Sequence, residues 1–279
     1  MIVLSRLPAT QLLAARKANA PNCTISLDLN LTTTTVQLDE VGVRLPGDLQ
    51  ITWQEVAQIT EKENSCFEVT ADGIDEIRAF SETTSRYCSL YATQSAPTLV
   101  IAGFPMHRIK ESDPHRDTLE KIKTIAPITG VVLDTTLGLG YTAIEAAKTA
   151  EKVITLELDP AVIEICRRNP WSQGLFTRSN LELRNVDSFE EIRTFDDGMF
   201  DRILHDPPVF SLAGDLYSGE FYRELFRVLK PKGLLFHYIG NPDSVSAGRV
   251  TKGAIRRLQE SGFRTIRDAS RAFGVVAMK

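Results

Sequence analysis

The feature that most constrains this fold is the alternation of short apolar segments with helical patterns after about residue 120. The pattern predicts strands at 130–133, 153–158, 181–186, 200–205, 234–239, 264–267 and 274–278, and helices at 141–149, 160–168, 188–195, 217–229 and 247–260. Strands that alternate with helices need crossover connections, which produce a mostly parallel sheet with helices on both faces. Ligands bind such sheets at the carboxyl ends of the strands, so the residues that end each strand are the candidates for function.

The first part of the chain has a different pattern. Apolar and polar residues alternate from Thr24 to Leu31, and similar β patterns follow at 33–38, 66–70, 76–80, 86–92 and 98–102, with a short helix at 53–59. These patterns predict a small antiparallel β-rich domain at residues 1–110, followed by the α/β domain at residues 111–279. The polar segment 105–118 contains two prolines and is interpreted as the connection.

Composition excludes several classes of protein. The 279 residues carry a formal net charge of −4, so a uniformly basic nucleic-acid binder is excluded. Four cysteines without CxxC spacing argue against zinc ribbons and redox pairs, and no metal site is expected. No apolar run approaches the roughly 18 residues that cross a membrane, so we expect a cytoplasmic protein without a membrane partner.

Three acidic residues end consecutive predicted strands. Asp134 ends the first strand of the α/β domain, Glu157 the second and Asp187 the third. Gly138 and Gly140 follow Asp134, where glycine lets backbone approach a ligand closely. A G-x-G sequence alone can equally tighten a turn, but acids at three strand ends are hard to explain by packing. An acid at the end of the second strand typically accepts hydrogen bonds from ribose hydroxyls.

This end of the sheet does not suit a dinucleotide. Ala143 stands where the dinucleotide fingerprint has its third glycine, and the carboxylate of Asp134 would repel a pyrophosphate. The same carboxylate suits the amino group of a methionine moiety. The motif resembles that of class I S-adenosylmethionine-dependent methyltransferases, in which an acidic residue leads into G-x-G. The resemblance implies S-adenosylmethionine as cofactor and, as its binding residues, Asp134, Gly138, Gly140, Tyr141, Glu157 and Asp187.

The fourth strand ends in His205-Asp206-Pro207-Pro208. Two prolines stiffen the loop and leave its carbonyl groups as acceptors beside the Asp206 carboxylate. The motif resembles the (D/N)-P-P-(Y/F) loop of methyltransferases that modify exocyclic base amines or an amide. The resemblance implies that Asp206 and the Pro207 carbonyl hold the acceptor nitrogen, with Pro208 and His205 beside them. Val209 replaces the aromatic residue of that motif and Phe210 follows it, which puts stacking on a flat base in doubt.

A narrower resemblance covers most of the chain. The His-Asp-Pro-Pro motif, together with segments 103–108, 138–141, 169–172, 211–217, 221–222 and 236–240, resembles a prokaryotic family of predicted class I methyltransferases with a small N-terminal β domain. The resemblance implies a Rossmann-like, mostly parallel α/β sheet preceded by a small β-rich domain. It implies methyl transfer without naming the acceptor.

Other polar residues are candidates for the acceptor side of the site. Histidines at strand ends are often satisfied structural hydrogen-bonding groups, but His205 and His237 beside Asp206 could also accept the proton that a methylated amine loses. Phe210, Tyr217 and His237 are candidate substrate contacts. His107, in the connection, is either a substrate clamp or part of an ordinary linker.

Three functions remain open at this point. Methyl transfer to an amine, in RNA or in a small molecule, is the leading hypothesis. Aminopropyl transfer of the spermidine-synthase type uses a similar architecture but favours a second acid beside the fourth strand, for which Asp215 is the nearest candidate. The third is a non-catalytic methyltransferase-like binding subunit.

The distribution of charge keeps RNA open as the acceptor. From Val245 onward the chain has eight basic and two acidic residues, whereas residues 1–110 have nine basic and twelve acidic. Such a basic run is usually only a solvated face, and it can also bind nucleic acid directionally. A homodimer is likewise left open.

Overall fold

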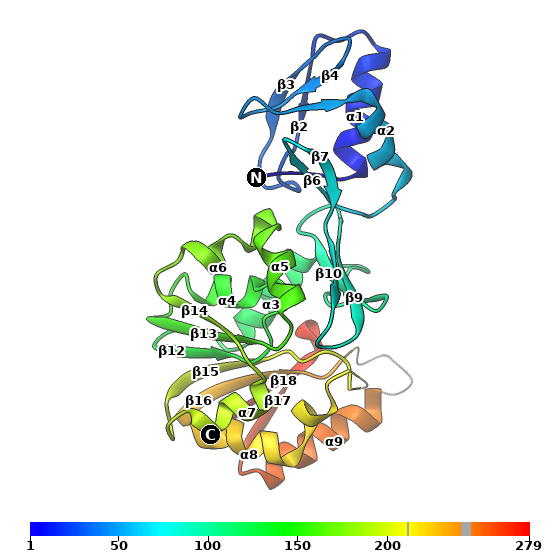
Figure 1. Cartoon of the computed structure of the whole chain (residues 1–279). Helices are drawn as coiled ribbons and strands as arrows, with labels where there is room; N and C mark the ends of the chain where they lie inside the picture. The colour runs from blue at the N-terminus through cyan, green and yellow to red at the C-terminus, as the bar shows by residue number, and fades with distance from the viewer. Residues whose placement is uncertain (211, 241–246) are drawn as a thin grey trace. The chain divides into compact units, whose positions relative to one another are not determined.

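The computed structural model describes residues 1–210, 212–240 and 247–279. Ser211, within one of the segments that carry the narrower resemblance, lies outside the described residues. The chain divides into two compact units, Met1–His115 with Ala161–Gln173, and Arg116–Pro160 with Gly174–Lys279. Each is described by itself below (Figure 1). Among the described residues, no helix is both long enough and apolar enough to span a bilayer.

Three small antiparallel sheets form most of the first unit, with the strand orders β1-β6-β7, β2-β3-β4-β5 and β11-β10-β9-β8. The predicted β-rich N-terminal part is therefore confirmed. Two helices accompany the sheets, α1 (Arg6–Lys17) and α2 (Trp53–Glu61), and Thr52 with Glu55 forms a capping box at the start of α2. The strands are β1 (Ile2–Leu4), β2 (Asn22–Ile25), β3 (Thr34–Leu38), β4 (Gly42–Arg44), β5 (Gln50–Thr52), β6 (Phe67–Thr70), β7 (Gly73–Glu76), β8 (Arg78–Ser81), β9 (Arg86–Tyr91), β10 (Thr98–Ile101) and β11 (Phe104–Pro105).

The strand expected from Thr24 to Leu31 ends early, at Ile25. The Ser26 hydroxyl accepts hydrogen bonds from the backbone of Asp28 and Asn30, which turns the chain. Asn30 also has a positive φ of 74°, a left-handed conformation that no strand residue adopts. Local side-chain hydrogen bonds thus overrule the alternating pattern.

Residues 161–173, which follow β13 in the chain, group with the first unit for a visible reason. The Arg168 guanidinium lies 2.8 Å from the Glu68 carboxylate and 2.6 Å from that of Asp75. The Trp171 indole N–H donates to the Leu29 carbonyl at 2.8 Å. Most of the helix α5 (Pro160–Arg167) belongs to this group.

A seven-stranded sheet forms the centre of the second unit, with the order β14-β13-β12-β15-β16-β18-β17. Strand β18 pairs antiparallel with both its neighbours, and the pairs from β14 to β16 are parallel. The predicted mostly parallel α/β sheet is confirmed. The strands are β12 (Val131–Asp134), β13 (Lys152–Glu157), β14 (Leu181–Asn185), β15 (Phe200–His205), β16 (Leu229–Tyr238), β17 (Thr265–Ala269) and β18 (Gly274–Met278).

The strand order locates the ligand site within this sheet. From β12 the chain winds outward to β13 and β14, and then returns to the other side of β12 with β15. This reversal makes the β12–β15 pair a topological switch point, where the crossover connections diverge and a crevice opens at the carboxyl ends. Asp134 ends β12 and pairs with Leu204 of β15, one residue before His205. The glycine motif and the His-Asp-Pro-Pro motif therefore both begin at the switch point.

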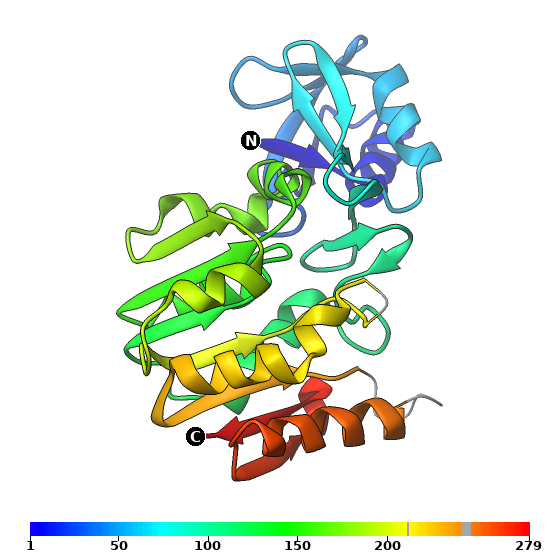
Figure 2. The same cartoon turned by 60° about the horizontal axis from the view of Figure 1, so that its bottom comes forward.

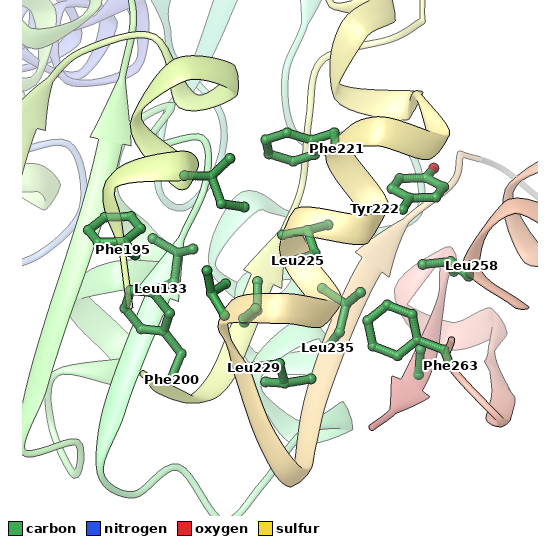
Figure 3. Packing of buried hydrophobic residues seen from close by; sticks show 14 of the residues in the cluster. Leu133, Phe195, Phe200, Phe221, Tyr222, Leu225, Leu229, Leu235, Leu258 and Phe263 are labelled. Carbon is green, nitrogen blue, oxygen red and sulfur yellow. The ribbon is translucent and has the colours of Figure 1, made fainter. Parts of the chain in front are cut away.

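Helices cover both faces of the sheet, with α3 and α4 on one face and α7, α8 and α9 on the other (Figures 1 and 2). The Ser218 hydroxyl caps α8 by accepting the Phe221 N–H, and the buried face of α8 comprises Phe221, Tyr222, Leu225 and Val228. Figure 3 shows Phe221, Tyr222 and Leu225 packed with Leu235 of the sheet and with Leu258 and Phe263, and Val228 belongs to the same buried cluster. The helices are α3 (Pro114–Thr124), α4 (Tyr141–Ala146), α6 (Gly174–Thr177), α7 (Ser188–Glu191), α8 (Gly219–Val228) and α9 (Ala247–Glu260).

The segment 105–118, interpreted as a polar connection, contains the start of α3. The Asp113 carboxylate accepts the His115 N–H at 3.0 Å, and Pro114 is the first helical residue. An acceptor followed by proline is a helix-start signal. The helix was missed because its buried face carries charged residues in place of apolar ones.

The packing of α8 predicts that Leu225→Ala lowers the free energy of unfolding of the second unit by about 2–5 kcal/mol, because the cavity forms in a fully buried cluster. Denaturant unfolding measures the change. Arg223 is exposed on the same helix, so Arg223→Ala is the matched control and should stay within about 0.5 kcal/mol of the parent. Equal losses in both variants would contradict this description of the core.

Candidate functional site

The site begins with Asp134, which the end of β12 places at the switch point. Its side chain is fully buried, and one oxygen, Oδ2, accepts hydrogen bonds from the hydroxyls of Thr142 (3.1 Å) and Thr155 (3.3 Å). The other oxygen, Oδ1, is buried and has no hydrogen-bond partner among the described residues. A buried carboxylate oxygen without a partner is costly unless a ligand supplies a donor.

Burial raises the pKa of Asp134 to about 8, although the Thr142 hydroxyl lowers it, and the charge of Asp206 raises it further. At neutral pH the free protein therefore holds much of this carboxyl in its protonated form. A cationic group at Oδ1 would favour ionisation and compensate the burial.

The loop between β12 and α4 approaches Glu157 through its backbone. Gly138 has a φ of 54°, and its N–H donates to Glu157 Oε2 at 3.3 Å. Gly140 has a φ of 75°, and a Cβ there would lie 2.5 Å from the Leu175 side chain. Both positions therefore require glycine, Gly138 by conformation and Gly140 by conformation and space. The predicted glycine pair thus shapes the loop that faces the strand ends.

Glu157, at the end of β13, also accepts the Asp159 N–H at 2.9 Å through Oε1. Burial raises the pKa of Glu157 to about 7, and the Asp159 N–H lowers it. Each carboxylate oxygen keeps a second lone pair, so the side chain has capacity for further donors such as ribose hydroxyls. Glu157 and Asp134 come together at neighbouring strand ends, as the sequence predicts.

Asp187 and Tyr141 both stand at the start of a helix. Asp187 is exposed and caps α7 by accepting the Phe189 N–H at 2.8 Å. Tyr141 is the first residue of α4 and is 7% exposed. Capping of α7 accounts for one oxygen of Asp187, and its role toward an adenine amine stays a prediction.

The acceptor loop, defined as Asp206 to Pro208, follows β15 and is held by groups from three segments. The Lys121 ammonium on α3 lies 2.6 Å from Asp206 Oδ2. The Thr136 hydroxyl, in the glycine loop, donates to the Asp206 carbonyl at 2.8 Å. The Tyr217 hydroxyl donates to the Pro208 carbonyl at 2.9 Å, with the Pro207 carbonyl at 3.4 Å.

These contacts change the expectation for Tyr217. The sequence places it as a substrate contact, but it is 5% exposed and its hydroxyl is directed at the loop carbonyls. The Tyr217 hydroxyl therefore already uses part of the hydrogen-bond-accepting capacity of the Pro207 and Pro208 carbonyls. Phe210 is 61% exposed, and its ring lies 5.7 Å from that of Tyr217, edge to face.

His205 is fully buried, and both of its ring nitrogens have partners. Nε2 lies 2.9 Å from the Leu216 carbonyl and Nδ1 lies 2.8 Å from the Thr135 hydroxyl. Because a carbonyl only accepts, Nε2 carries the proton and Nδ1 accepts from Thr135. Burial lowers the pKa of His205 to about 3.

His237 has the complementary arrangement. Its Nδ1 donates to the His205 carbonyl at 3.3 Å, and its Nε2 accepts from the Tyr222 hydroxyl at 2.6 Å. Burial lowers the pKa of His237 well below its usual value, and His205 lowers it further. Of the two roles considered for these histidines, this geometry favours structural hydrogen bonding, because neither ring has a nitrogen available to take a proton from a substrate.

His107 belongs to the first unit. Its Nδ1 lies 3.0 Å from the Thr98 hydroxyl, which also accepts the His107 backbone N–H at 3.2 Å. The structure thus describes His107 as anchored to β10, and its part as a substrate clamp stays a prediction.

The sequence reasoning missed Lys121, Asp117 and Thr136. Lys121 bridges Asp117 and Asp206 although it is only 2% exposed. Asp117 and Lys121 stand four residues apart on α3, a spacing that brings two side chains of a helix together. That spacing is a usable signal in the sequence, but the polar, proline-containing character of segment 105–118 favours a linker there.

The chain is similar to several known proteins. A family described as a methyltransferase domain matches residues 132–233. An uncharacterized protein of Methanocaldococcus jannaschii is 49% identical over 185 residues, which cover 66% of this chain and 64% of that protein. A polyamine aminopropyltransferase of Pyrobaculum arsenaticum is 31% identical over 115 residues, covering 37% of this chain and 39% of that enzyme.

Among solved structures, spermidine synthase from Thermotoga maritima superposes with a TM-score of 0.56 at 18% identity, covering 76% of this chain and 77% of that chain. At this identity the likeness concerns the fold alone. Together with the strand order, these comparisons show that the second unit has a methyltransferase-like α/β fold.

The buried histidines predict a dependence of stability on pH. Because His205 has a pKa of about 3 when folded and about 6.5 when unfolded, the unfolded chain binds one more proton between these values. The contribution of His205 is thus fully present above about pH 6.5 and is lost as pH falls toward 3.

His205→Gln should therefore flatten the pH dependence of unfolding by about 1.4 kcal/mol per pH unit between pH 4 and 6. Denaturant titrations of both proteins across this range measure the two slopes. Asp134 and Glu157 also change protonation with pH, but they do so equally in the parent and in the variant. Their contribution therefore cancels when the two slopes are compared. Parallel slopes would contradict the assignment of a neutral buried His205.

Proposed function

We propose that the chain is an S-adenosylmethionine-dependent methyltransferase that methylates an amine nitrogen held at the acceptor loop. The observation that carries the proposal is the buried Oδ1 of Asp134, which has no well-formed hydrogen bond among the described residues although the Thr136 backbone N–H lies near this carboxyl, at the switch point of a methyltransferase-like sheet. The cofactor's amino group has the charge and hydrogen-bonding capacity that this oxygen requires. The match of residues 132–233 to a methyltransferase domain supports the same conclusion.

One group of residues binds the cofactor, and another group orients the acceptor nitrogen. Asp134 holds the amino group, the backbone at Gly138 and Gly140 lets the ligand approach closely, and Glu157 accepts the ribose hydroxyls. When bound, the cofactor supplies an electrophilic methyl group on sulfur. Asp206 orients the acceptor nitrogen by accepting its N–H, and the stiff loop fixes the direction of attack. Catalysis of this kind depends mainly on positioning.

Aminopropyl transfer is the second candidate, and specific observations favour it. Polyamine aminopropyltransferases are among the sequence relatives, and spermidine synthases share the fold. Asp117 also supplies the second acid near Asp206 that the sequence analysis had sought at Asp215. That acid is engaged by Lys121, however, and this engagement favours the first candidate.

Calorimetry with four ligands distinguishes these functions. Methyl transfer predicts tight binding of S-adenosylmethionine and S-adenosylhomocysteine. Aminopropyl transfer predicts a preference for methylthioadenosine and decarboxylated S-adenosylmethionine. Failure to bind any of them would leave only a non-catalytic module. Mass spectrometry of modified nucleosides and small amines, from cells with and without the protein, then tests RNA and small-molecule amines as acceptors.

Cofactor affinity should depend on pH through Asp134. Since the pKa of Asp134 is about 8 in the free protein, ionising it for an ammonium partner releases a proton below that pH. The affinity for S-adenosylhomocysteine should therefore rise by up to about tenfold per pH unit from pH 6 and level off above pH 8. Asp134→Asn should weaken this binding at least about tenfold and remove the part of its pH dependence that comes from Asp134, leaving the part that comes from Glu157. Methylthioadenosine, which lacks the amino-acid tail, should bind both proteins similarly; an equal loss for it would count against the contact.

Asp206→Ala should leave cofactor affinity nearly intact and lower turnover at least about tenfold, which corresponds to ~1.4 kcal/mol. Transfer of labelled methyl to the acceptor identified above measures turnover, and calorimetry with S-adenosylhomocysteine provides the control. Unchanged turnover would remove Asp206 from the acceptor site.

A further inference from the structure

A buried ion bridge lies beside the acceptor loop. Lys121 Nζ lies 2.7 Å from Asp117 Oδ2 and 2.6 Å from Asp206 Oδ2, with side chains 2%, 0% and 19% exposed in the order Lys121, Asp117, Asp206. Nζ also lies 5.0 Å from the centre of the Tyr238 ring. A lysine is rarely buried to this degree unless its charge is compensated.

The lysine remains charged in this environment. Burial alone would lower the pKa of Lys121, but Asp206 and Asp117 outweigh this effect and raise the pKa. The three donors of an ammonium group are matched by two carboxylates and an aromatic face. The two carboxylates thus already hold an alkylammonium group, and it belongs to the protein.

Resting on the methyltransferase function proposed above, we infer that Lys121 makes the acceptor site selective for a neutral nitrogen, such as an exocyclic base amine or an amide, over an alkylammonium. Two unpaired carboxylates would attract an incoming ammonium strongly. In this protein Lys121 already bridges the two carboxylates. Its ammonium lies 2.6 Å from Asp206 Oδ2 and would repel an incoming ammonium. An ionised carboxylate has about four lone-pair sites, so Asp206 can still accept an N–H from a neutral amine.

The chemistry of transfer fits a neutral acceptor. The nitrogen lone pair forms the N–C bond while the C–S bond breaks. The electron pair of the C–S bond stays on sulfur, which becomes a neutral thioether. The methylated nitrogen, now cationic, then loses a proton to bulk water. An alkylammonium has no lone pair until it is deprotonated, and a carboxylate paired with a buried lysine is a poor base for that step.

Binding of spermidine to the protein saturated with S-adenosylhomocysteine tests the inference. The parent protein should show no saturable binding at millimolar spermidine by calorimetry or thermal shift. Lys121→Met leaves the two carboxylates without an internal cation and should gain spermidine affinity at least about tenfold over the parent. Lys121→Arg keeps the charge and should exclude spermidine. Lys123 is exposed on the same helix, so Lys123→Met is the matched control and should behave as the parent.

The outcomes separate this inference from the proposed function. Saturable spermidine binding by the parent, with S-adenosylhomocysteine bound, would overturn the selectivity of Lys121 and leave methyl transfer standing. Failure of the parent to bind S-adenosylhomocysteine would overturn the proposed function itself. If Lys121→Met does not fold, the parent and Lys121→Arg titrations decide the question, because spermidine binding in either contradicts the inference.

Discussion

The parallel pairing of β12 with β15 is the constraint on which the site depends. It places Asp134 in register with Leu204, so the loop that leaves β12 and the loop that leaves β15 start side by side. The Thr136 hydroxyl then joins the two loops directly through the Asp206 carbonyl. The proposed cofactor end and the proposed acceptor end, with Thr136 and Asp206 70 positions apart in the chain, are joined by backbone pairing and by the hydroxyls of Thr136 and Thr135, the latter 2.8 Å from His205 Nδ1.

Burial sets the electrostatics of both ends in opposite ways. Asp134 is buried with an unpartnered oxygen, which raises its pKa and leaves the free protein incomplete without a donor. Lys121 is buried with two carboxylates, which keep it charged. The first arrangement is suited to receiving a ligand, and the second is complete within the protein. This contrast is the basis for proposing that Asp134 binds the cofactor and that Lys121 sets the selectivity for the acceptor.

Much of the fold and part of the site follow from the sequence. The strand ends at Asp134, Glu157 and His205 were predictable because apolar segments lead into them, with a glycine turn after Asp134 and prolines after Glu157 and His205. Lys121 was not predictable, because its importance comes from a partner 85 positions away along the chain. Local hydrogen bonds around Ser26 likewise ended a strand that its alternation favoured. The Tyr217 hydroxyl contacts carbonyls only nine and ten positions away, but no residue pattern in the intervening loop indicates that contact.

The three groups that hold the acceptor loop share a property that the cofactor end lacks. Thr136 does not titrate, Lys121 stays protonated because its pKa is raised, and burial raises the pKa of Tyr217 above its usual value. None of the three changes its protonation near neutrality, whereas Asp134 and Glu157 titrate at about 8 and 7. The groups that hold the proposed acceptor loop therefore keep their charge over the physiological pH range, whereas the carboxyls at the proposed cofactor end change theirs.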